Sequence, residues 1–257
     1  RNYKMADNDT ALTQLEGKNP IAEALAAGRS INRVYLLESA KGRASDLSKL
    51  ADECQKQGAV ISYVNRARLD SMAETQAHQG IIAEVAPYDY QDLDRILEHC
   101  ESQNIAPFLL LLDHIQDAHN LGSILRIADG AGVHAVVIPK RRAVPLNAAV
   151  AKASAGAVEH VPICRVNNLT DTILALKKQG FWIFGTDAAA TLHYKEADYG
   201  GPIAIVIGSE GEGIAQKIKG HCDFLVSIPL HGKVNSLNAA VASGIIVFEA
   251  ASGRGQS

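Results

Sequence analysis

Residues 205–218 read IVIGSEGEGIAQKI, and this stretch indicates how the second half of the chain is built. A run of apolar, mostly β-branched residues ends at Gly208, and glycines then alternate with Glu210 and Glu212. Apolar runs without polar alternation are typical of strands buried on both faces of a parallel sheet. Glycine-rich turns after such strands usually face a ligand, but carboxylates repel a phosphate. The turn therefore suits a ligand that is cationic or rich in hydrogen-bond donors.

Similar apolar runs recur on both sides of this stretch. We predict strands near Pro107–Asp113, Val133–Pro139, Val161–Val166, Phe181–Asp187, Pro202–Gly208 and Phe224–Pro229, and a last helix over Ser236–Ala251. Helical stretches separate most of these strands, so an α/β fold with a parallel sheet covered on both faces is expected. Ligands of such sheets bind at the carboxyl edge of the strands.

The first third of the chain predicts a separate α/β unit. Strands are expected over 31–39, 59–65 and 80–87, with helices after Asn19-Pro20 and over 43–58 and 66–76. Asn19 is expected to cap the first helix, with Pro20 at its first position. The chain is therefore divided into a polar disordered start (1–13), a first domain (14–88), a polar linker (89–105) and a second domain (106–257).

The composition is that of an ordinary globular protein. The chain has 257 residues, 47% hydrophobic and 21% charged, and its apolar runs are too short to span a bilayer. No signal-peptide pattern opens it, and four widely spaced cysteines lack any C-x-x-C pair, so reduced thiols and a cytoplasmic location are expected. The net charge of −3 disfavours a purely electrostatic nucleic-acid binder. Candidate RNA contacts are therefore local basic residues: Arg29, Arg33, Lys140, Arg141 and Arg142.

A second polar strand end lies in LDHIQDAHNLGSILRIADGAGV (112–133). Asn120 is expected to cap the following helix, and Arg126 lies in an apolar stretch where a charge needs a partner or a ligand. The simplest partner is Asp129 or Asp113. The spacing of His114 and His119 fits no usual metal site, so no metal is predicted.

A third polar segment is IPLHGKVNSLNAAVASGIIVFE (228–249). Ser236 is expected to be the N-cap of the last helix, and Asn238 is then surplus to capping. Small residues from Ala239 to Gly244 allow close approach of another helix or subunit. The glycine order G-x-x-G-x-G at 208–213, after the fifth strand of its domain, excludes both the dinucleotide fingerprint and the P-loop. A nicotinamide-dependent oxidoreductase is therefore disfavoured.

DAHNLGSILRIADGAG, IVIGSEGEG and IPLHGKVNSLNAAVA, in this order, resemble the three signature motifs of the SpoU/TrmH family of RNA ribose methyltransferases, within the SPOUT superfamily. The resemblance covers residues 14–251. The first domain, with LEGKNPIAEAL and HQGIIAEV, looks like the L30e-type RNA-binding domain attached to many of these enzymes. Within the family, the chain resembles the bacterial 23S rRNA guanosine 2′-O-methyltransferases of the RlmB type.

The resemblance implies a fold and a reaction that residue patterns cannot give. The second domain should carry a deep C-terminal trefoil knot that binds S-adenosylmethionine, and the protein should be a homodimer. The reaction is methylation of a ribose 2′-hydroxyl, and the RNA partner is expected to be 23S rRNA or a ribosome assembly intermediate. Because the cofactor is a sulfonium cation without phosphate, acids in the glycine turn are no obstacle.

The resemblance also assigns residues by position. Arg126 would anchor a phosphate and stabilise the developing alkoxide, Asn120 would position the nucleotide or Arg126, and Glu210 would organise loops through backbone N–H groups. Ser236 and Asn238 would hold the loops and the substrate. The expected cofactor contacts are Thr186, Ala188, Gly208, Glu210, Gly211, Ile228, Leu230, Ser236, Asn238 and Ala239. Ala240 stands where many relatives have a serine, which puts a role for that hydroxyl in doubt.

Two alternatives remain open at this point. One is the same chemistry on tRNA, or on an rRNA adenosine as in antibiotic-resistance relatives. The other is a non-catalytic RNA-binding assembly factor that keeps the fold. Retention of polar residues in all three motifs argues against the second alternative.

Overall fold

The computed structural model describes residues 13–42, 44–75, 77–233 and 236–254. The chain forms two compact units: Arg1–Asp89 with Pro145–His160, and Tyr90–Val144 with Val161–Ser257. Apart from Thr13, the predicted disordered start lies outside the described residues.

The first unit is built on a four-stranded mixed sheet. The strand order is β1 (Gln14–Glu16), β4 (Ile81–Val85), β2 (Ile31–Leu37) and β3 (Val60–Val64); only β2 and β3 are parallel. The helices are α1 (Lys18–Ala26), α2 (Asp46–Lys56) and α3 (Arg66–Met72), and a 3₁₀ turn, η1, spans Glu38–Ala40. The three predicted strands are present. β1 was missed because three residues show no periodicity.

The start of α1 differs from the prediction. The helix begins at Lys18 after Gly17, so Asn19 and Pro20 lie inside its first turn. Gly17 adopts φ +88°, a conformation that other residues rarely adopt. The amide of Lys18 donates to Oε1 of Gln79 at 3.2 Å, so a distant side chain satisfies a free N–H where Asn19 was expected to do so.

Residues Pro145–His160 belong to the first unit, although the predicted boundaries placed them in the second domain. They form α6 (Ala148–Ala153) and the 3₁₀ turn η2 (Ala157–Glu159). Arg29 pairs with Glu159 at 2.6 Å, with 9% and 5% of the two side chains exposed. His160 Nε2 lies 2.8 Å from Glu23 Oε2. These contacts link segments more than 100 residues apart, which no local pattern reveals.

The second unit contains the predicted parallel sheet. Its seven strands follow the order β7-β6-β5-β10-β8-β11-β9, and all neighbours are parallel. The strands are β5 (Phe108–Leu112), β6 (Ala135–Pro139), β7 (Ile163–Val166), β8 (Trp182–Thr186), β9 (Leu192–His193), β10 (Ile203–Ile207) and β11 (Phe224–Ser227). All six predicted strands are confirmed, and the two-residue β9 is additional. β5 and β10 are buried along their whole length, as their unbroken apolar sequences require.

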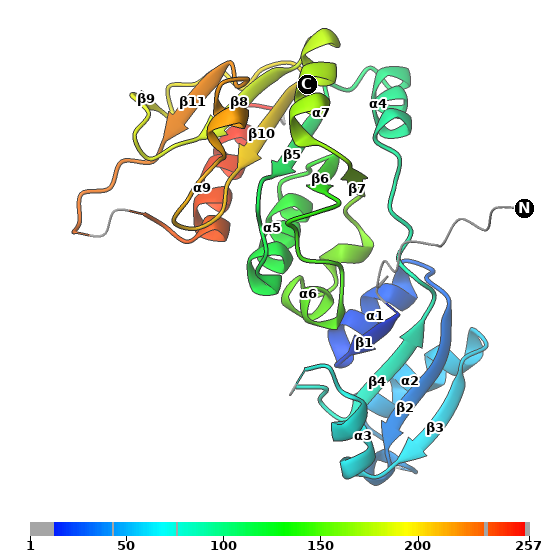
Figure 1. Ribbon diagram of the computed structural model, residues 1–257. Coiled ribbons are helices and arrows are strands. Elements are labelled where there is room, and N and C mark those ends of the chain that lie inside the picture. The colour runs from blue at the N-terminus through cyan, green and yellow to red at the C-terminus, as the bar shows by residue number, and fades with distance from the viewer. Residues whose placement is uncertain (1–12, 43, 76, 234–235, 255–257) are drawn as a thin grey trace, which may run out of the picture. The chain divides into compact units, whose positions relative to one another are not determined.

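Helices cover both faces of this sheet (Figure 1). α4 (Leu93–Ser102), α7 (Leu169–Lys178) and α8 (Gln216–Lys219) share one hydrophobic core with the strands, and α5 (Ala118–Gly130) packs beside α9 (Ala239–Ser252) on the other face. The predicted linker 89–105 therefore needs correction. From Tyr90 onward it belongs to the second unit, because α4 buries Leu97 and Cys100.

The strand order reverses between β5 and β10. From β5 the chain proceeds outward to β6 and β7, and then crosses to β8 and β10 on the other side. Crevices at such reversal points, outside the carboxyl ends of the strands, are where open α/β sheets bind ligands. The segments after β5 and β10 are the histidine-containing segment at 113–117 and the glycine turn at 208–213.

Candidate functional site

The glycine turn after β10 is closed by its own backbone. Ser209 and Gly213 exchange two hydrogen bonds, of 3.2 and 3.0 Å, and Gly211 and Gly213 have φ of +89° and +68°. A Cβ on Gly208 would lie 2.1 Å from the carbonyl carbon of Gly213. The glycines are thus required by close approach and by left-handed backbone, and not by a phosphate.

Asp113, at the end of β5, ties this turn to the sheet. Its amide donates to Ile207 O at 2.8 Å, and its Oδ2 accepts from Ala215 N at 2.8 Å. The residue is 2% exposed. Its Oδ1 lies 2.6 Å from Nδ1 of His114, so both carboxylate oxygens have a partner and Asp113 is a fixed element of the site.

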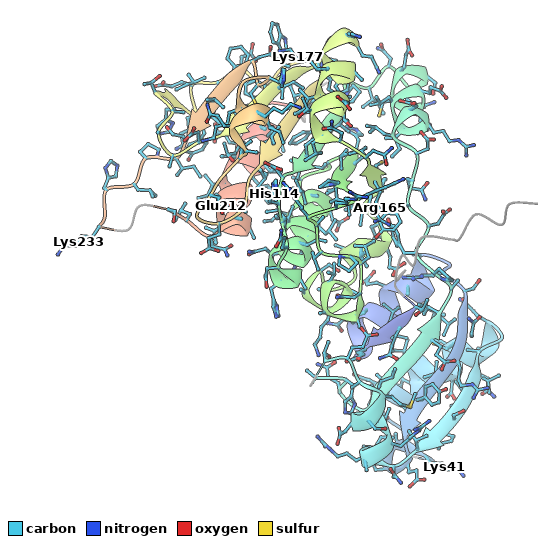
Figure 2. All side chains as sticks on the ribbon, in the orientation of Figure 1. Lys41, His114, Arg165, Lys177, Glu212 and Lys233 are labelled. Carbon is cyan, nitrogen blue, oxygen red and sulfur yellow. The ribbon has the colours of Figure 1, made fainter. Side chains whose placement is uncertain are left out.

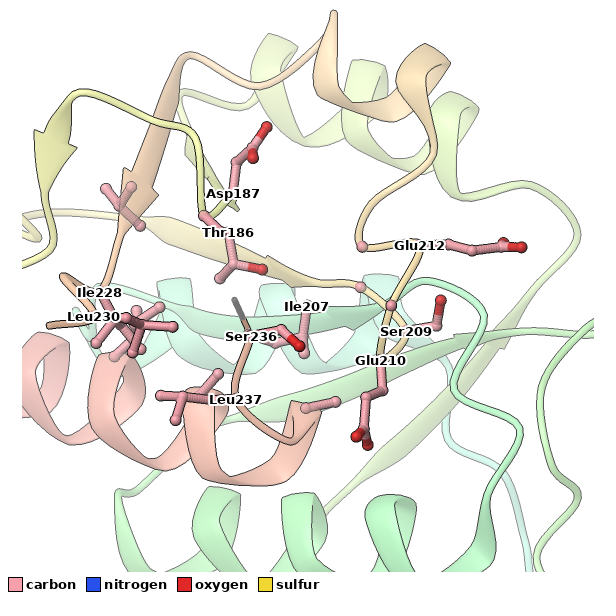
Figure 3. A pocket seen from close by; sticks show the side chains of 18 of the residues that line it. Thr186, Asp187, Ile207, Ser209, Glu210, Glu212, Ile228, Leu230, Ser236 and Leu237 are labelled. Atoms are coloured by element: carbon pink, nitrogen blue, oxygen red, sulfur yellow. The ribbon is translucent and has the colours of Figure 1, made fainter. Parts of the chain in front are cut away.

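A cavity of about 380 Å³, the glycine-turn cavity, opens beside this turn (Figure 3). Its walls come from the ends of β8, β10 and β11 and from the start of α9. The lining residues are Thr186, Asp187, Ala188, Ile207, Gly208, Ser209, Glu210, Gly211, Glu212, Gly213, Lys219, Val226, Ile228, Leu230, Ser236, Leu237, Ala239, Ala242 and Ile246.

The lining divides by chemistry. Figure 3 shows Ile228, Leu230 and Leu237 on one side and the carboxylates of Glu210 and Glu212 on the other. Nine of the ten predicted cofactor residues line this cavity: Thr186, Ala188, Gly208, Glu210, Gly211, Ile228, Leu230, Ser236 and Ala239. A cavity with an apolar side and an acidic side suits a flat apolar group joined to a cationic one.

A second cavity of about 660 Å³, the Asn120 cavity, shares the glycine turn with the first. Ser209, Glu210 and Glu212 line both cavities. The other lining residues of the second are His114, Ile115, Gln116, Asp117, His119, Asn120 and Asn238. Two ligands bound in these cavities would therefore meet at the glycine turn.

Asn238 connects the three motifs. Its Nδ2 donates to Asn120 Oδ1 at 2.8 Å and to Glu210 Oε2 at 3.1 Å. The predicted role of Glu210 is therefore corrected: its carboxylate accepts from a side-chain amide, and among the described residues no backbone N–H donates to it. Asn120, Glu210 and Asn238 come together as one hydrogen-bonded group, and Asn238 lines the Asn120 cavity instead of the glycine-turn cavity.

Two predicted helix caps are wrong. Asp117, not Asn120, caps α5, with Oδ1 accepting from Asn120 N at 2.8 Å. Asn238, not Ser236, caps α9, with Oδ1 accepting from Ala240 N at 2.9 Å and Val241 N at 3.3 Å. In both cases two polar residues stand close together, and propensity cannot tell which one starts the helix.

Arg126 lies apart from both cavities in the single chain. It is exposed on α5 and lines neither of them. In the described part of the chain its guanidinium has no hydrogen bond or ion pair, so the expected pairing with Asp129 or Asp113 is absent. Arg126 and Gly130 share a helix face, and a Cβ on Gly130 would lie 3.4 Å from the ring of Phe248 on α9.

The predicted RNA-binding residues differ in exposure. Arg33 is exposed on β2, 5.9 Å from the centroid of Tyr35, and Lys140 and Arg141 are exposed after β6. Arg142 is exposed, and its Nη1 lies 3.3 Å from His114 Nε2. The prediction that Arg29 binds RNA needs correction. Its guanidinium is enclosed by Glu159 and by the carbonyl of Ala86, so Arg29 is a structural residue.

Asp187 and Lys219 were not predicted, although both line the glycine-turn cavity. Lys219 Nζ donates to Asp187 Oδ2 at 2.7 Å, and this bond, with the amide of Ala189, holds the pKa of the Asp187 carboxyl below its usual range. The pair fixes the loop after β8. Asp187 is the last residue of a predicted strand, and this position at the carboxyl edge is a usable signal. No sequence pattern singles out Lys219.

Two kinds of feature are not found among the described residues. No helix among them is long and apolar enough to cross a membrane. In the same part of the chain, no three His, Cys, Asp or Glu side chains cluster so as to hold a metal ion. The four cysteines are free, and burial raises the pKa of Cys164 to about 12.

Comparison with protein families gives two matches that together cover most of the chain. Residues 107–248 match the SpoU rRNA Methylase family. Residues 14–91 match the family described as RNA 2′-O ribose methyltransferase substrate binding.

Individual relatives agree with these matches. A protein of Bacillus subtilis (strain 168), provisionally named TrmH family tRNA/rRNA methyltransferase YacO, is 47% identical over 91% of this chain and 92% of its own length. A similarly named protein of Staphylococcus saprophyticus is 43% identical over the same shares. The crystal structure of the SpoU methyltransferase AviRb from Streptomyces viridochromogenes, in complex with the cofactor AdoMet, has a TM-score of 0.78 at 26% identity. That match covers 95% of this chain and 91% of AviRb.

Proposed function

This chain belongs to the SpoU rRNA methylase family, and from this premise we propose that it transfers the methyl group of S-adenosylmethionine to a ribose 2′-hydroxyl of RNA. The observation that carries the proposal is the pair of adjoining cavities. They share the glycine turn, and the bonded side chains of Asn120, Glu210 and Asn238 lie where they meet.

The glycine-turn cavity fits the cofactor by size and by chemistry. Its volume of about 380 Å³ lies in the range of small-molecule sites. Ile228, Leu230 and Leu237 offer an apolar surface for an adenine ring, and Glu210 and Glu212 offer negative charge for a sulfonium. The related SpoU methyltransferase AviRb binds AdoMet, in agreement with this assignment. When bound, S-adenosylmethionine supplies a methyl group that is already activated for transfer.

The residues of the chain then have to bind and orient the cofactor and the RNA, and they have to exclude water. Ser236 and Ala239 line the cofactor cavity at the start of α9. The Asp187–Lys219 pair fixes the loop that carries Thr186 and Ala188. Asn120 and Asn238 face the second cavity, where a ribose would lie next to the methyl group. Orientation of two partners at near-contact distance is worth several kcal/mol of activation free energy, about 7–11 in favourable cases.

We further propose that Arg126 acts across a homodimer. It lies on the same face of α5 as Gly130, and Gly130 lies beside Phe248 of α9. On α9, Val241 lies two turns before Phe248 and on the same face of the helix. Half of each of these two apolar side chains is exposed. A dimer formed through this α5/α9 face would bury them and bring Arg126 to a partner's cavity, where it would hold a phosphate and stabilise the developing alkoxide.

The finer assignments follow the same line. We propose that the C-terminal segment forms the deep trefoil knot, that the RNA is 23S rRNA or a ribosome assembly intermediate, and that the target is a guanosine. The first unit, without its buried Arg29, would contact the RNA through exposed residues such as Arg33. In the second unit, Lys140, Arg141 and Arg142 would do so. The protein would work in the cytoplasm.

Methyl transfer tests the proposal directly. Labelled S-adenosylmethionine is incubated with total rRNA and total tRNA from a strain that lacks this protein, with Arg126→Ala in parallel. Label recovered as ribose-methylated guanosine of large-subunit rRNA, and lost in the variant, is the expected result. Label only in tRNA would overturn the rRNA assignment, and cofactor binding without label in any RNA, including assembling ribosomal particles, would refute enzymatic activity.

A further inference from the structure

We propose that His114, held by Asp113, is the general base that takes the proton of the ribose 2′-hydroxyl; this rests on the proposed function. The reaction must remove that proton, and a guanidinium such as that of Arg126 stays protonated at neutral pH. A side chain that accepts this proton near the meeting point of the two cavities would accelerate the step. His114 lines the Asn120 cavity together with Glu212, and Figure 2 labels both residues.

The geometry around His114 fixes its tautomer. Nδ1 lies 2.6 Å from Oδ1 of Asp113, whose other oxygen accepts the amide of Ala215. Because Asp113 is buried and acts as an acceptor, the proton of a neutral His114 ring stays on Nδ1 and the lone pair is on Nε2. A carboxylate that orients an imidazole in this way also stabilises the imidazolium formed when Nε2 takes a proton.

Two residues with left-handed backbone meet at this point. His114 has φ +60° and Arg142 has φ +61°, a region that side chains other than Asn, Asp and His rarely adopt. Nη1 of Arg142 lies 3.3 Å from Nε2 of His114, at the long end of a hydrogen bond. The backbone at these two residues directs their side chains toward each other.

Arg142 then has a part in the same step. A guanidinium prefers a phosphate oxygen to a neutral imidazole, because the phosphate bond is bidentate and charge-assisted. RNA that brings a phosphate to Arg142 draws it away from His114 and leaves Nε2 available. The proton acceptor is thus released only when substrate is present.

The atoms balance without a further reactant. The 2′-oxygen forms its bond to the methyl carbon while the carbon–sulfur bond breaks, and that bonding pair goes to sulfur. The hydroxyl proton passes to Nε2 of His114 and then to solvent. Nδ1 keeps its proton and its bond to Asp113.

Other titratable and charged groups face His114. They come from its own loop and the start of α5, from the glycine turn, and from the loop after β6: Asp113, Asp117, His119, Glu210, Glu212 and Arg142. His119 lines the same cavity, but it is exposed, and the described residues offer its ring no carboxylate partner. Of the two histidines that line this cavity, His114 is the one whose ring tautomer is fixed by a carboxylate.

The test is a single-turnover methyl-transfer rate at saturating RNA and cofactor, measured against pH, for the full chain and three variants. His114→Gln removes the base, and His114→Gly removes it while placing glycine where φ is positive, so this variant keeps the fold. His99→Gln, a substitution of an exposed histidine on α4 remote from both cavities, is the matched control.

We expect both His114 variants to lose about 100-fold or more in rate, the usual worth of a general base, with little change in cofactor or RNA affinity. The rate of the parent should rise with pH with unit slope on its acidic limb, and this limb should disappear in the variants. Added imidazole should restore His114→Gly, which a purely structural role does not allow.

Three results decide against the proposal. A His114→Gln rate within about threefold of the parent, with the acidic limb kept, excludes a base at this position. A loss seen only in RNA affinity, without rescue by imidazole, makes His114 a binding residue. A parent protein that binds S-adenosylmethionine but methylates no RNA removes the proposed function itself, and His114 then has no reaction to serve.

Discussion

Both polar atoms of the Asn238 side-chain amide form hydrogen bonds. Its oxygen caps α9, and its nitrogen bonds to Asn120 and Glu210. Because the capping bonds fix the oxygen, the two donor hydrogens can point only toward the other motifs. The start of α9 is thereby tied to the start of α5 and to the glycine turn.

Replacing Asn238 by alanine should therefore affect stability and rate separately. Loss of the cap should cost about 1 kcal/mol in the free energy of unfolding. Loss of the bonds to Asn120 and Glu210 should lower methyl transfer by about tenfold or more, the equivalent of one hydrogen bond. Denaturant unfolding and single-turnover rates measure the two effects.

Asn168→Ala is the matched control for this substitution. Asn168 caps α7 through its bond to Thr170 N and lines neither cavity. It should lose similar stability at an unchanged rate. Equal loss of rate in both variants would mean that Asn238 acts only through stability.

The Asp187–Lys219 pair predicts a pH effect on stability. The pKa of Asp187 is lowered in the folded protein, so the pair stabilises the fold above the pKa of an unfolded aspartate, about 3.9. That stabilisation is lost as the pH falls through the lowered folded pKa.

Asp187→Asn should accordingly be less stable than the parent by about 1 kcal/mol at neutral pH, with the difference shrinking as the pH falls below about 4. Thermal unfolding at a series of pH values measures this. A difference that stays constant down to pH 2 would assign the effect to something other than the charge of Asp187.

The glycine turn makes the clearest prediction for a structural element. A Cβ at Gly208 would overlap the backbone of Gly213 and Ile214, so Gly208→Ala should open the turn and abolish cofactor binding by calorimetry. Gly232→Ala is the control, since a Cβ there meets nothing within 4 Å. Cofactor binding that survives in Gly208→Ala would show that the turn adapts and does not form the cavity.

The elements themselves were largely predictable from the sequence. Unbroken apolar runs such as residues 108–112 and 203–207 require strands buried on both faces, and the polar motifs after them mark the carboxyl edge. The short β1 and β9 and the choice between neighbouring caps were not predictable, because a few residues carry no period. The sequence assigns no role to His114, because its proposed role as a base depends on a hydrogen bond to Asp113 that only the folded backbone at φ +60° creates.

For the assembled protein we expect a dimer that depends on the α5/α9 face. Val241→Glu combined with Phe248→Glu should convert it to a monomer by light scattering, because both side chains are half exposed in the single chain. Leu174→Glu on α7, an exposed leucine in the opposite helix layer, should leave the mass unchanged. A parent protein that is already monomeric would exclude the arrangement.

If Arg126 serves the partner's cavity, two inactive variants should complement each other. Arg126→Ala keeps an intact cofactor cavity, and Gly208→Ala keeps the arginine. An equal mixture refolded together should recover up to about a quarter of parental activity, since half of the random dimers then contain one complete site. An inactive mixture that contains heterodimers would place Arg126 in its own chain's site.

Because Pro145–His160 belong to the first unit, the two units cannot be separated by a single cut in the chain. The polypeptide passes from one unit to the other three times, after Asp89, Val144 and His160, instead of once. A protease that nicks the chain near Asp89 therefore yields two fragments that do not correspond to the two units. A gene cut at that point gives a first half without the 3₁₀ turn that carries Glu159, and so removes the ion pair that Glu159 forms with the largely buried Arg29. The first unit is thus not a domain that can be transferred as one continuous segment. Grafting it onto another enzyme would require residues 145–160 to be transferred with it.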